Sequence, residues 1–139
     1  MSLTTDIFFY NAIMADDAIV TTVEERVFNP ARPTADEERD LIPYIIISFG
    51  GLQNQAETKD DVEGWTDDVP VHILCVADSR DSLGDLAEAV RLQVREYWKE
   101  HDGESGVPLD WHFSASEVSY DPDKPCCYQT LHYDCNSDR

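Results

Sequence analysis

Basic residues are scarce in this sequence. Only 10 lysines and arginines stand against 29 aspartates and glutamates, which gives a formal net charge of −19. Tight binding to nucleic acid depends on basic side chains that displace counterions from the phosphates. We therefore expect no specific binding to DNA or RNA.

Long apolar runs are also missing. No segment approaches the roughly 18 consecutive apolar residues that span a bilayer, and the first residues do not form the charged and then apolar pattern of a secretion signal. We expect a soluble protein that is made in the cytoplasm and does not contact a membrane. The 139 residues are enough to enclose one hydrophobic core, so a single domain is predicted over residues 1–139.

The short motifs that mark common active sites are absent. The sequence contains no G-x-S-x-G nucleophile turn, no G-x-x-x-x-G-K phosphate loop and no G-x-G-x-x-G dinucleotide loop. The doublets Asp60-Asp61 and Asp67-Asp68 do not have the spacing of a calcium-binding loop. We expect no enzymatic activity, no metal and no cofactor. A site that forms only when distant segments come together in the fold stays open as an alternative.

The stretch richest in cysteine and histidine is Cys126 to Cys135, CCYQTLHYDC. If it forms a β-strand, His132 and Cys135 point to opposite faces because they are three residues apart. Cys127 and Cys135 share a face, but eight strand residues separate them by roughly 26 Å. The close C-x₂₋₄-C pair of zinc sites is missing. These cysteines are therefore predicted to be buried, reduced strand residues rather than metal ligands or a disulfide.

The acidic composition bears on the conditions under which the chain folds. In molar salt the screening length falls to about 3 Å, and a strongly charged chain loses most of its self-repulsion. The excess of acids fits a protein from a salt-rich cytoplasm. It equally fits an ordinary acidic protein.

Hydrophobic periodicity predicts an α+β fold. The clearest helix spans 82–100, where apolar residues recur every three or four positions, and a first helix is expected over 5–15. Leu41 to Phe49 is apolar almost without interruption, which indicates a strand buried on both faces. Further strands are predicted at 26–29, 69–77, 110–120 and 126–135. Together these elements predict a mainly antiparallel β-sheet with two principal α-helices packed on one face. The residues expected to face the core from the helices are Ile7, Tyr10, Ile13, Met14, Leu86, Val90 and Val94.

Between two of these strands lies a polar, acidic connection, Gln53 to Asp68. It has few residues for the core, so a long exposed hairpin tip is expected, and such connections often carry function. Its polar and acidic residues are the candidate interaction site. They are Gln53, Glu57, Asp60, Asp61, Glu63, Asp67 and Asp68.

Four local patterns follow one another along the chain. They are Arg26-Val27-Phe28-Asn29-Pro30, then Ile42-Pro43-Tyr44-Ile45-Ile46, then Val71 to Ala77 leading into Leu86-Ala87-Glu88-Ala89-Val90-Arg91, and a closing strand from Cys127 to Cys135. In this order the chain resembles the tail-terminator (tail-completion) proteins of long-tailed phages and archaeal tailed viruses. The resemblance covers most of the chain, but the acidic connection is less regular than the loop usual in that family.

The resemblance implies a virion protein that has neither enzymatic activity nor a cofactor. It implies a homo-oligomeric ring, a hexamer, at the tail–neck junction, with the tail tube protein and a head-completion or neck protein as partners. DNA would pass through the ring without specific binding, and the acidic connection would reach the lumen or the adjoining ring, since like charge keeps phosphates from sticking. Two alternatives stay open: another head–tail connector protein, and a small ligand-binding domain or enzyme.

Overall fold

The computed structural model describes residues 5–24, 26–28, 42–49, 66–104, 107–108, 110–122 and 125–138. In chain order the elements are α1 (Thr5–Met14), α2 (Asp17–Val23), β1 (Val27–Phe28), β2 (Tyr44–Phe49), β3 (Thr66–Ala77), α5 (Arg80–His101), β4 (Asp110–Ala115), β5 (Ser119–Asp121) and β6 (Cys126–Asp138). The predicted α+β fold is confirmed. Within the described ranges, no helix combines the length and the apolar character that crossing a bilayer requires.

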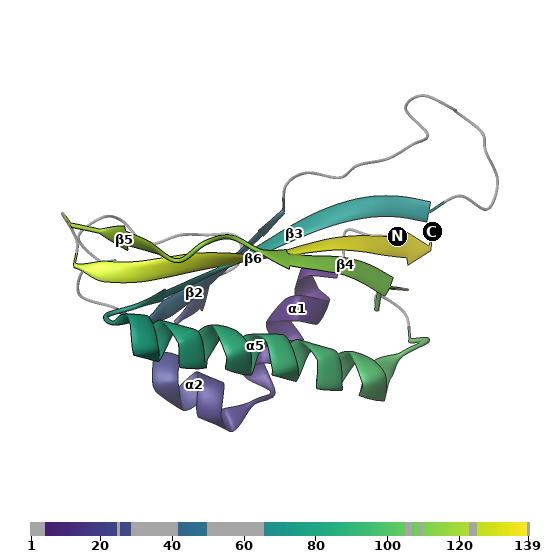
Figure 1. Ribbon diagram of the computed structural model, residues 1–139. Helices are drawn as coiled ribbons and strands as arrows, with labels where there is room; N and C mark the ends of the chain where they lie inside the picture. Colours follow the sequence, from purple (N-terminus) through teal and green to yellow (C-terminus); the bar gives the residue numbers. More distant parts are fainter. Residues whose placement is uncertain are drawn as a thin grey trace.

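The strands form a six-stranded sheet in the order β1-β2-β3-β6-β4, and β5 pairs with β6 beyond the end of β4. Only the short pair of β1 and β2 is parallel, and the other pairs are antiparallel. β3 and β6 are the long central strands, paired from Thr66 with Asp138 to Ala77 with Cys127. The helices lie on one face of this sheet, as predicted (Figure 1).

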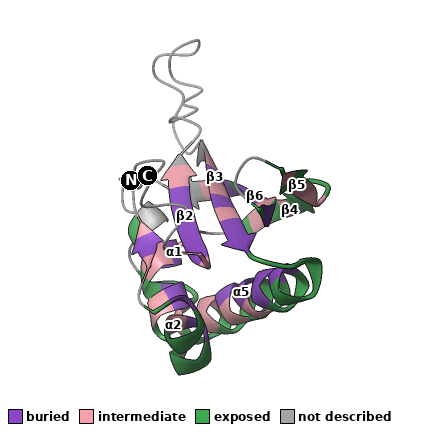
Figure 2. Ribbon diagram, turned by 90° about the vertical axis from the view of Figure 1, so that its left-hand side faces the viewer, coloured by how far each residue is buried: buried purple, intermediate pink, exposed green. Residues whose placement is uncertain are grey.

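The long helix α5 forms because its apolar residues recur on one side and its first turn is capped. The Ser79 hydroxyl accepts a hydrogen bond from the Ser82 backbone N–H at 3.1 Å, which satisfies one of the free donors at the helix start. The buried stripe consists of Leu83, Leu86, Ala87, Val90 and Val94. It faces the sheet (Figure 2), so the predicted helix is confirmed, with two more residues at its start and one more at its end.

The first helix differs in detail from the prediction. Ile13 is fully buried, whereas Ile7 is 51 % exposed, so Ile7 does not belong to the core face as expected. The buried residues of α1 are instead Phe8, Phe9, Ala12 and Ile13. A side-chain hydrogen bond from Gln93 Nε2 to the Ala12 carbonyl, 2.9 Å long, ties α1 to α5. A short helix, α2, follows α1, and the Asp16 side chain caps it.

The sheet centre is buried on both faces, as the continuous apolarity of 41–49 predicted. On the helix side, Ile45 and Ile47 of β2 join Val71 and Ile73 of β3 in the main core. On the other side, a smaller cluster comprises Tyr44, Ile46, Val76 and Cys126.

The single strand predicted over 110–120 is two strands. β4 ends at Ala115 and β5 begins at Ser119, and both pair with β6. Between them Ser116 replaces part of the backbone ladder: its hydroxyl accepts a hydrogen bond from Thr130 N–H at 3.0 Å, and its own N–H donates to Thr130 C=O at 2.9 Å. The strand is interrupted because the Ser116 hydroxyl accepts the hydrogen bond of the Thr130 N–H, which a backbone carbonyl would accept in a continuous strand.

Candidate functional site

The acidic connection is shorter than predicted. β3 begins at Thr66 rather than Val69, so Asp67 and Asp68 lie in a strand, where they pair with Ser137 and Asn136 of β6. Their expected place in the hairpin tip is therefore wrong, because the long β6 extends the ladder past the apolar part of β3. The other five candidate residues lie outside the described residues: Gln53, Glu57, Asp60, Asp61 and Glu63. The role of all seven candidate residues toward a lumen or an adjoining ring stays a prediction.

The cysteine-rich stretch is the strand β6, as predicted. All four cysteines of the chain are buried, and none of them forms a disulfide bond. Cys127 and Cys135 lie in the core on the helix side, and Cys126 lies in the cluster on the other side. Burial raises the pKa of Cys75 and Cys135 to about 12. Because the thiolate is the reactive form, these two thiols are not nucleophiles at neutral pH.

A histidine pair lies on the sheet face away from the helices. His72 of β3 and His132 of β6 are directly opposite each other, with their Nδ1 atoms 3.2 Å apart and their rings nearly perpendicular at 83°. One Nδ1 must carry a hydrogen and the other must accept it. Burial first, and then His132, lower the pKa of His72 below its ordinary value of 6.5, whereas Asp134 opposes this shift.

This pair makes a prediction about pH. The unfolded chain binds a proton at His72 more readily than the folded chain does, so the free energy of unfolding should fall as the pH drops below about 6.5. In a His72→Gln variant, the free energy of unfolding should fall less over the same pH range. Urea unfolding between pH 7.5 and 5 measures this pH dependence. If the free energy of unfolding of His72→Gln fell with pH as steeply as that of the wild type, His72 would not be its source.

No three histidine, cysteine, aspartate or glutamate residues among those described are grouped so that they could hold a metal ion. In particular, the structure places His132 and Cys135 on opposite faces of β6 as expected, since Cys135 is in the helix-side core and His132 meets His72 on the other side. The expected absence of a metal and of a cofactor remains a prediction.

A groove runs between α5 and the edge strand β4. Its first part holds about 110 Å³ and is lined by Arg91, Leu92, Arg95, Trp111, Phe113 and Tyr133. Its second part is lined by Arg95, Trp98, Lys99, Asp110 and Trp111. Arg95 and Trp111 line both parts, so the two parts adjoin each other. We call these nine residues the α5–β4 groove.

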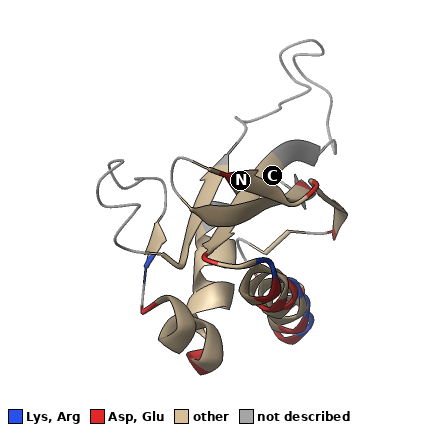
Figure 3. Cartoon of the chain, turned by 60° about the vertical axis from the view of Figure 1, so that its left-hand side comes forward, with Lys and Arg blue, Asp and Glu red and all other residues tan. Residues whose placement is uncertain are grey.

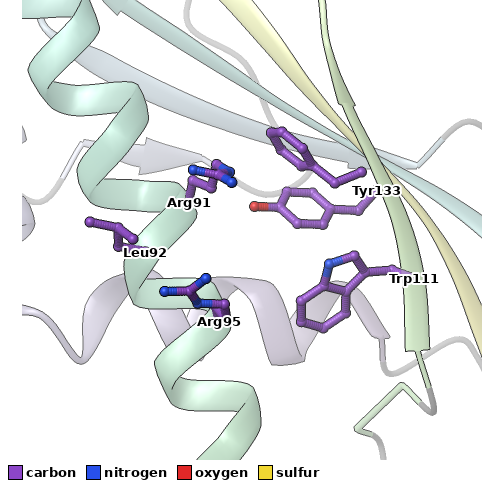
Figure 4. Close-up of a pocket in the computed structure, with 6 residues that line it drawn as sticks. Arg91, Leu92, Arg95, Trp111 and Tyr133 are labelled. Atoms are coloured by element: carbon purple, nitrogen blue, oxygen red, sulfur yellow. The ribbon is translucent and has the colours of Figure 1, made fainter.

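The groove is basic on one side and aromatic on the other (Figure 4). Arg91, Leu92 and Arg95 come from α5, while Trp111 and Tyr133 come from the sheet and point toward the helix (Figure 4). The Arg91 guanidinium lies over the Phe113 ring, 5.3 Å from its centroid. Tyr133 packs edge-on against Phe113 and Trp111, with ring centroids 5.1 and 5.6 Å away. The aromatic wall is thus part of the core.

The Tyr133 hydroxyl is the one buried side-chain oxygen or nitrogen, among the described residues, for which the structure provides no hydrogen-bond partner. The side chain is 1 % exposed, and its oxygen points toward α5 (Figure 4). Burial raises the pKa of this phenol, with smaller contributions from Cys75 and Cys135. It therefore stays protonated and can donate a hydrogen bond. Leaving a buried polar group unpaired costs about 1–3 kcal/mol.

Sequence reasoning missed the histidine pair and the groove. His72 and His132 are 60 residues apart, so only the register of β3 with β6 brings them together. The sequence does contain a signal of the groove, since Arg91, Arg95 and Lys99 are spaced by four and so lie on one side of a helix. The aromatic wall opposite them depends on which strand lies at the sheet edge, and the sequence does not state that order.

Comparison with known proteins gives a similarity of fold. No protein-family model matches the chain, and no curated protein matches it. A solved chain from the virion of a native gene transfer agent (GTA) particle superimposes with a TM-score of 0.64 over 94 % of this chain and 92 % of that chain. The two chains therefore share a fold. The sequences are 14 % identical, so the likeness is one of fold, and it covers nearly the whole length of both chains.

Proposed function

We propose that this protein is a structural component of a virion, and that it forms the ring that ends the tail tube and joins it to the head-side neck. The observation that carries the proposal is the shared fold with a chain of a gene transfer agent virion over 94 % of this chain. Because a fold by itself hosts many functions, the finer assignment rests on the tail-terminator resemblance in the sequence.

Two of the resembling segments are in contact, which supports treating them as one motif. Arg26 Nε donates to the Pro43 carbonyl at 3.1 Å, and the Ile45 N–H donates to the Arg26 carbonyl at 3.0 Å. These bonds position β1 beside β2, where Val27 pairs with Ile45. The remaining resembling segments lie in β3, α5 and β6, so they belong to the elements that form the core.

The chemistry of the described residues fits a structural role better than catalysis. The Cys75 and Cys135 thiols are buried and protonated at neutral pH, and the Nδ1 atoms of His72 and His132 pair with each other. A catalytic thiol must reach a substrate with its thiolate populated, and these two thiols do not meet that requirement. The protein is accordingly proposed to have no enzymatic activity.

In the proposed ring, six copies would surround passing DNA, with the tail tube protein on one side and a head-completion or neck protein on the other. The net charge of −19 suits that position, because like charge lets a duplex slide without binding. The residues from Gln53 to Glu63 would face the lumen or the adjoining ring. The protein would be found at the tail–neck junction of the virion.

The oligomeric state tests this proposal. In molar salt we expect the purified protein to have six times the 15.8 kDa mass of one chain, because a closed ring leaves no unpaired contact surface. Light scattering coupled to size-exclusion chromatography measures the mass, and negative-stain electron microscopy shows whether the particle has a central hole. A monomer at every salt and protein concentration would count against the ring.

A further inference from the structure

The α5–β4 groove concentrates positive charge in a chain that has little of it. Arg91, Arg95 and Lys99 are three of the chain's 10 basic residues, and all three line this one groove. In Figure 3 the lysine and arginine residues of α5 gather along one flank of the helix. In a protein with 29 acidic residues, these three basic side chains are suited to bind carboxylates.

The ion pairs that these bases form within the chain are weak. Arg91 is 3.5 Å from Glu88, Arg95 is 3.9 Å from Glu96, and Lys99 is 3.7 Å from Glu96, and each side chain is about half exposed. Exposed ion pairs of this kind contribute about 0–1 kcal/mol. Arg91 and Arg95 can therefore turn to an incoming carboxylate at little cost.

The inner wall of the groove offers what a buried carboxylate requires. The Tyr133 hydroxyl is a hydrogen-bond donor that has no partner among the described residues, and Trp111 and Phe113 line the groove beside it. Hydrogen bonds from charged or phenolic donors to a carboxylate are among the stronger ones in proteins. At the far end the Asp110 carboxylate accepts a hydrogen bond from Asn136, which leaves the three bases of the groove for an incoming carboxylate.

The strand beside the groove has an open edge. β4 pairs with β6 on one side and ends the strand order of the described sheet. An edge strand presents unpaired N–H and C=O groups, and an extended segment of another chain can add to it. The groove therefore offers backbone partners along β4 and charge partners along α5.

We propose that the α5–β4 groove binds an extended, carboxylate-bearing segment of a second copy of this chain. Its carboxylates would meet Arg91 and Arg95 and accept the hydrogen bond of Tyr133, while its backbone adds to β4. This inference rests on the proposed function, since a ring of more than two subunits needs two different complementary surfaces on each subunit. The α5–β4 groove would be one of those two surfaces.

The charge of the chain favours a second copy over DNA as the occupant. The groove supplies three positive charges, whereas the whole chain carries −19, so a duplex would be repelled by the rest of the surface. A copy of the same chain brings acids in excess. One acidic segment of the second copy can enter the groove while the other acidic surfaces of the two copies stay apart.

Charge reversal in the groove tests the proposal. At the lowest salt at which the wild-type chain is a folded ring, Arg95→Glu should raise the dissociation constant of the ring at least about tenfold, because like charges then face each other. Arg80→Glu is the matched control: it makes the same charge change at an exposed position on the same helix, and it should leave the ring unchanged. Leu92→Glu, at a groove residue that is 41 % exposed, should act like Arg95→Glu. Circular dichroism confirms that each variant folds.

The outcomes separate this inference from the proposed function. A wild-type chain that never forms a ring would overturn both. A ring that Arg95→Glu and Leu92→Glu leave as tight as wild type would overturn the groove assignment alone. Weaker binding of a labelled DNA duplex by Arg95→Glu, with an unchanged ring, would make the groove a DNA surface and equally overturn it.

Zero-length cross-linking identifies the occupant directly. A carbodiimide joins an amine to a carboxylate that touches it, and Lys99 is the amine of the groove. In rings mixed from ¹⁴N- and ¹⁵N-labelled chains, we expect peptides in which Lys99 of one copy is joined to an aspartate or glutamate of another. Links from Lys99 to its own neighbour Glu96 alone would contradict the proposal.

Discussion

Replacing Ile13 by alanine is expected to lower the free energy of unfolding by about 2–5 kcal/mol, the usual range for emptying a core site of this size. Ile13 is fully buried and belongs to the main core between the helices and the sheet. It sits beside Ala12, whose carbonyl accepts the Gln93 hydrogen bond from α5, so the helix is held in place and cannot collapse freely into the cavity.

Ile7→Ala is the matched control, since it removes the same atoms from the same helix at a position that is 51 % exposed. It should change the free energy of unfolding by no more than about 0.5 kcal/mol. Urea unfolding at one fixed salt and protein concentration compares the two variants. Equal losses for Ile7→Ala and Ile13→Ala would mean that α1 does not pack against the sheet as described.

Raising the salt from 0.1 M to molar concentration is expected to stabilise the folded protein. With a formal charge of −19, the folded chain repels itself, and the screening length shrinks from about 10 Å to about 3 Å over that range. We expect the melting temperature to rise by at least about 4 °C, which corresponds to roughly 1 kcal/mol for a domain of this length. Differential scanning calorimetry in potassium chloride measures the rise.

A variant with fewer acids separates charge screening from a general salt effect. Asp85→Asn, Glu100→Gln and Glu117→Gln together neutralise three exposed acids outside the core. The combined variant should melt higher than wild type in 0.1 M salt and gain less from added salt. A wild-type melting temperature that stays flat or falls with salt would contradict the repulsion argument, and it would leave the ring proposal untouched.

The features that the sequence revealed are those that depend on local pattern. The helix α5 was predictable because its apolar stripe and the Ser79 cap lie within one continuous segment. The burial of β2 on both faces followed from a run of apolar residues that no alternation interrupts. The strand character of Cys126 to Cys135 followed from spacing along the chain.

The features that the sequence did not reveal depend on pairing between distant segments. The extra length of β3, which takes in Asp67 and Asp68, exists because β6 supplies partners at Ser137 and Asn136. The break between β4 and β5 depends on the Ser116 hydroxyl reaching Thr130. The open side of the α5–β4 groove likewise depends on strand order. None of these is encoded within a single stretch.

The position of β6 has a consequence for synthesis. β6 is the last described strand along the chain, yet it lies between β3 and β4 and also pairs with β5. Until the ribosome has released residues 126–138, β3 lacks a neighbour on one side and β4 has no sheet to join. Long-range pairing of this kind closes late, after a large loop entropy has been overcome. A partly synthesised chain would therefore lack the α5–β4 groove, so nascent copies could not engage one another through it before each sheet is complete.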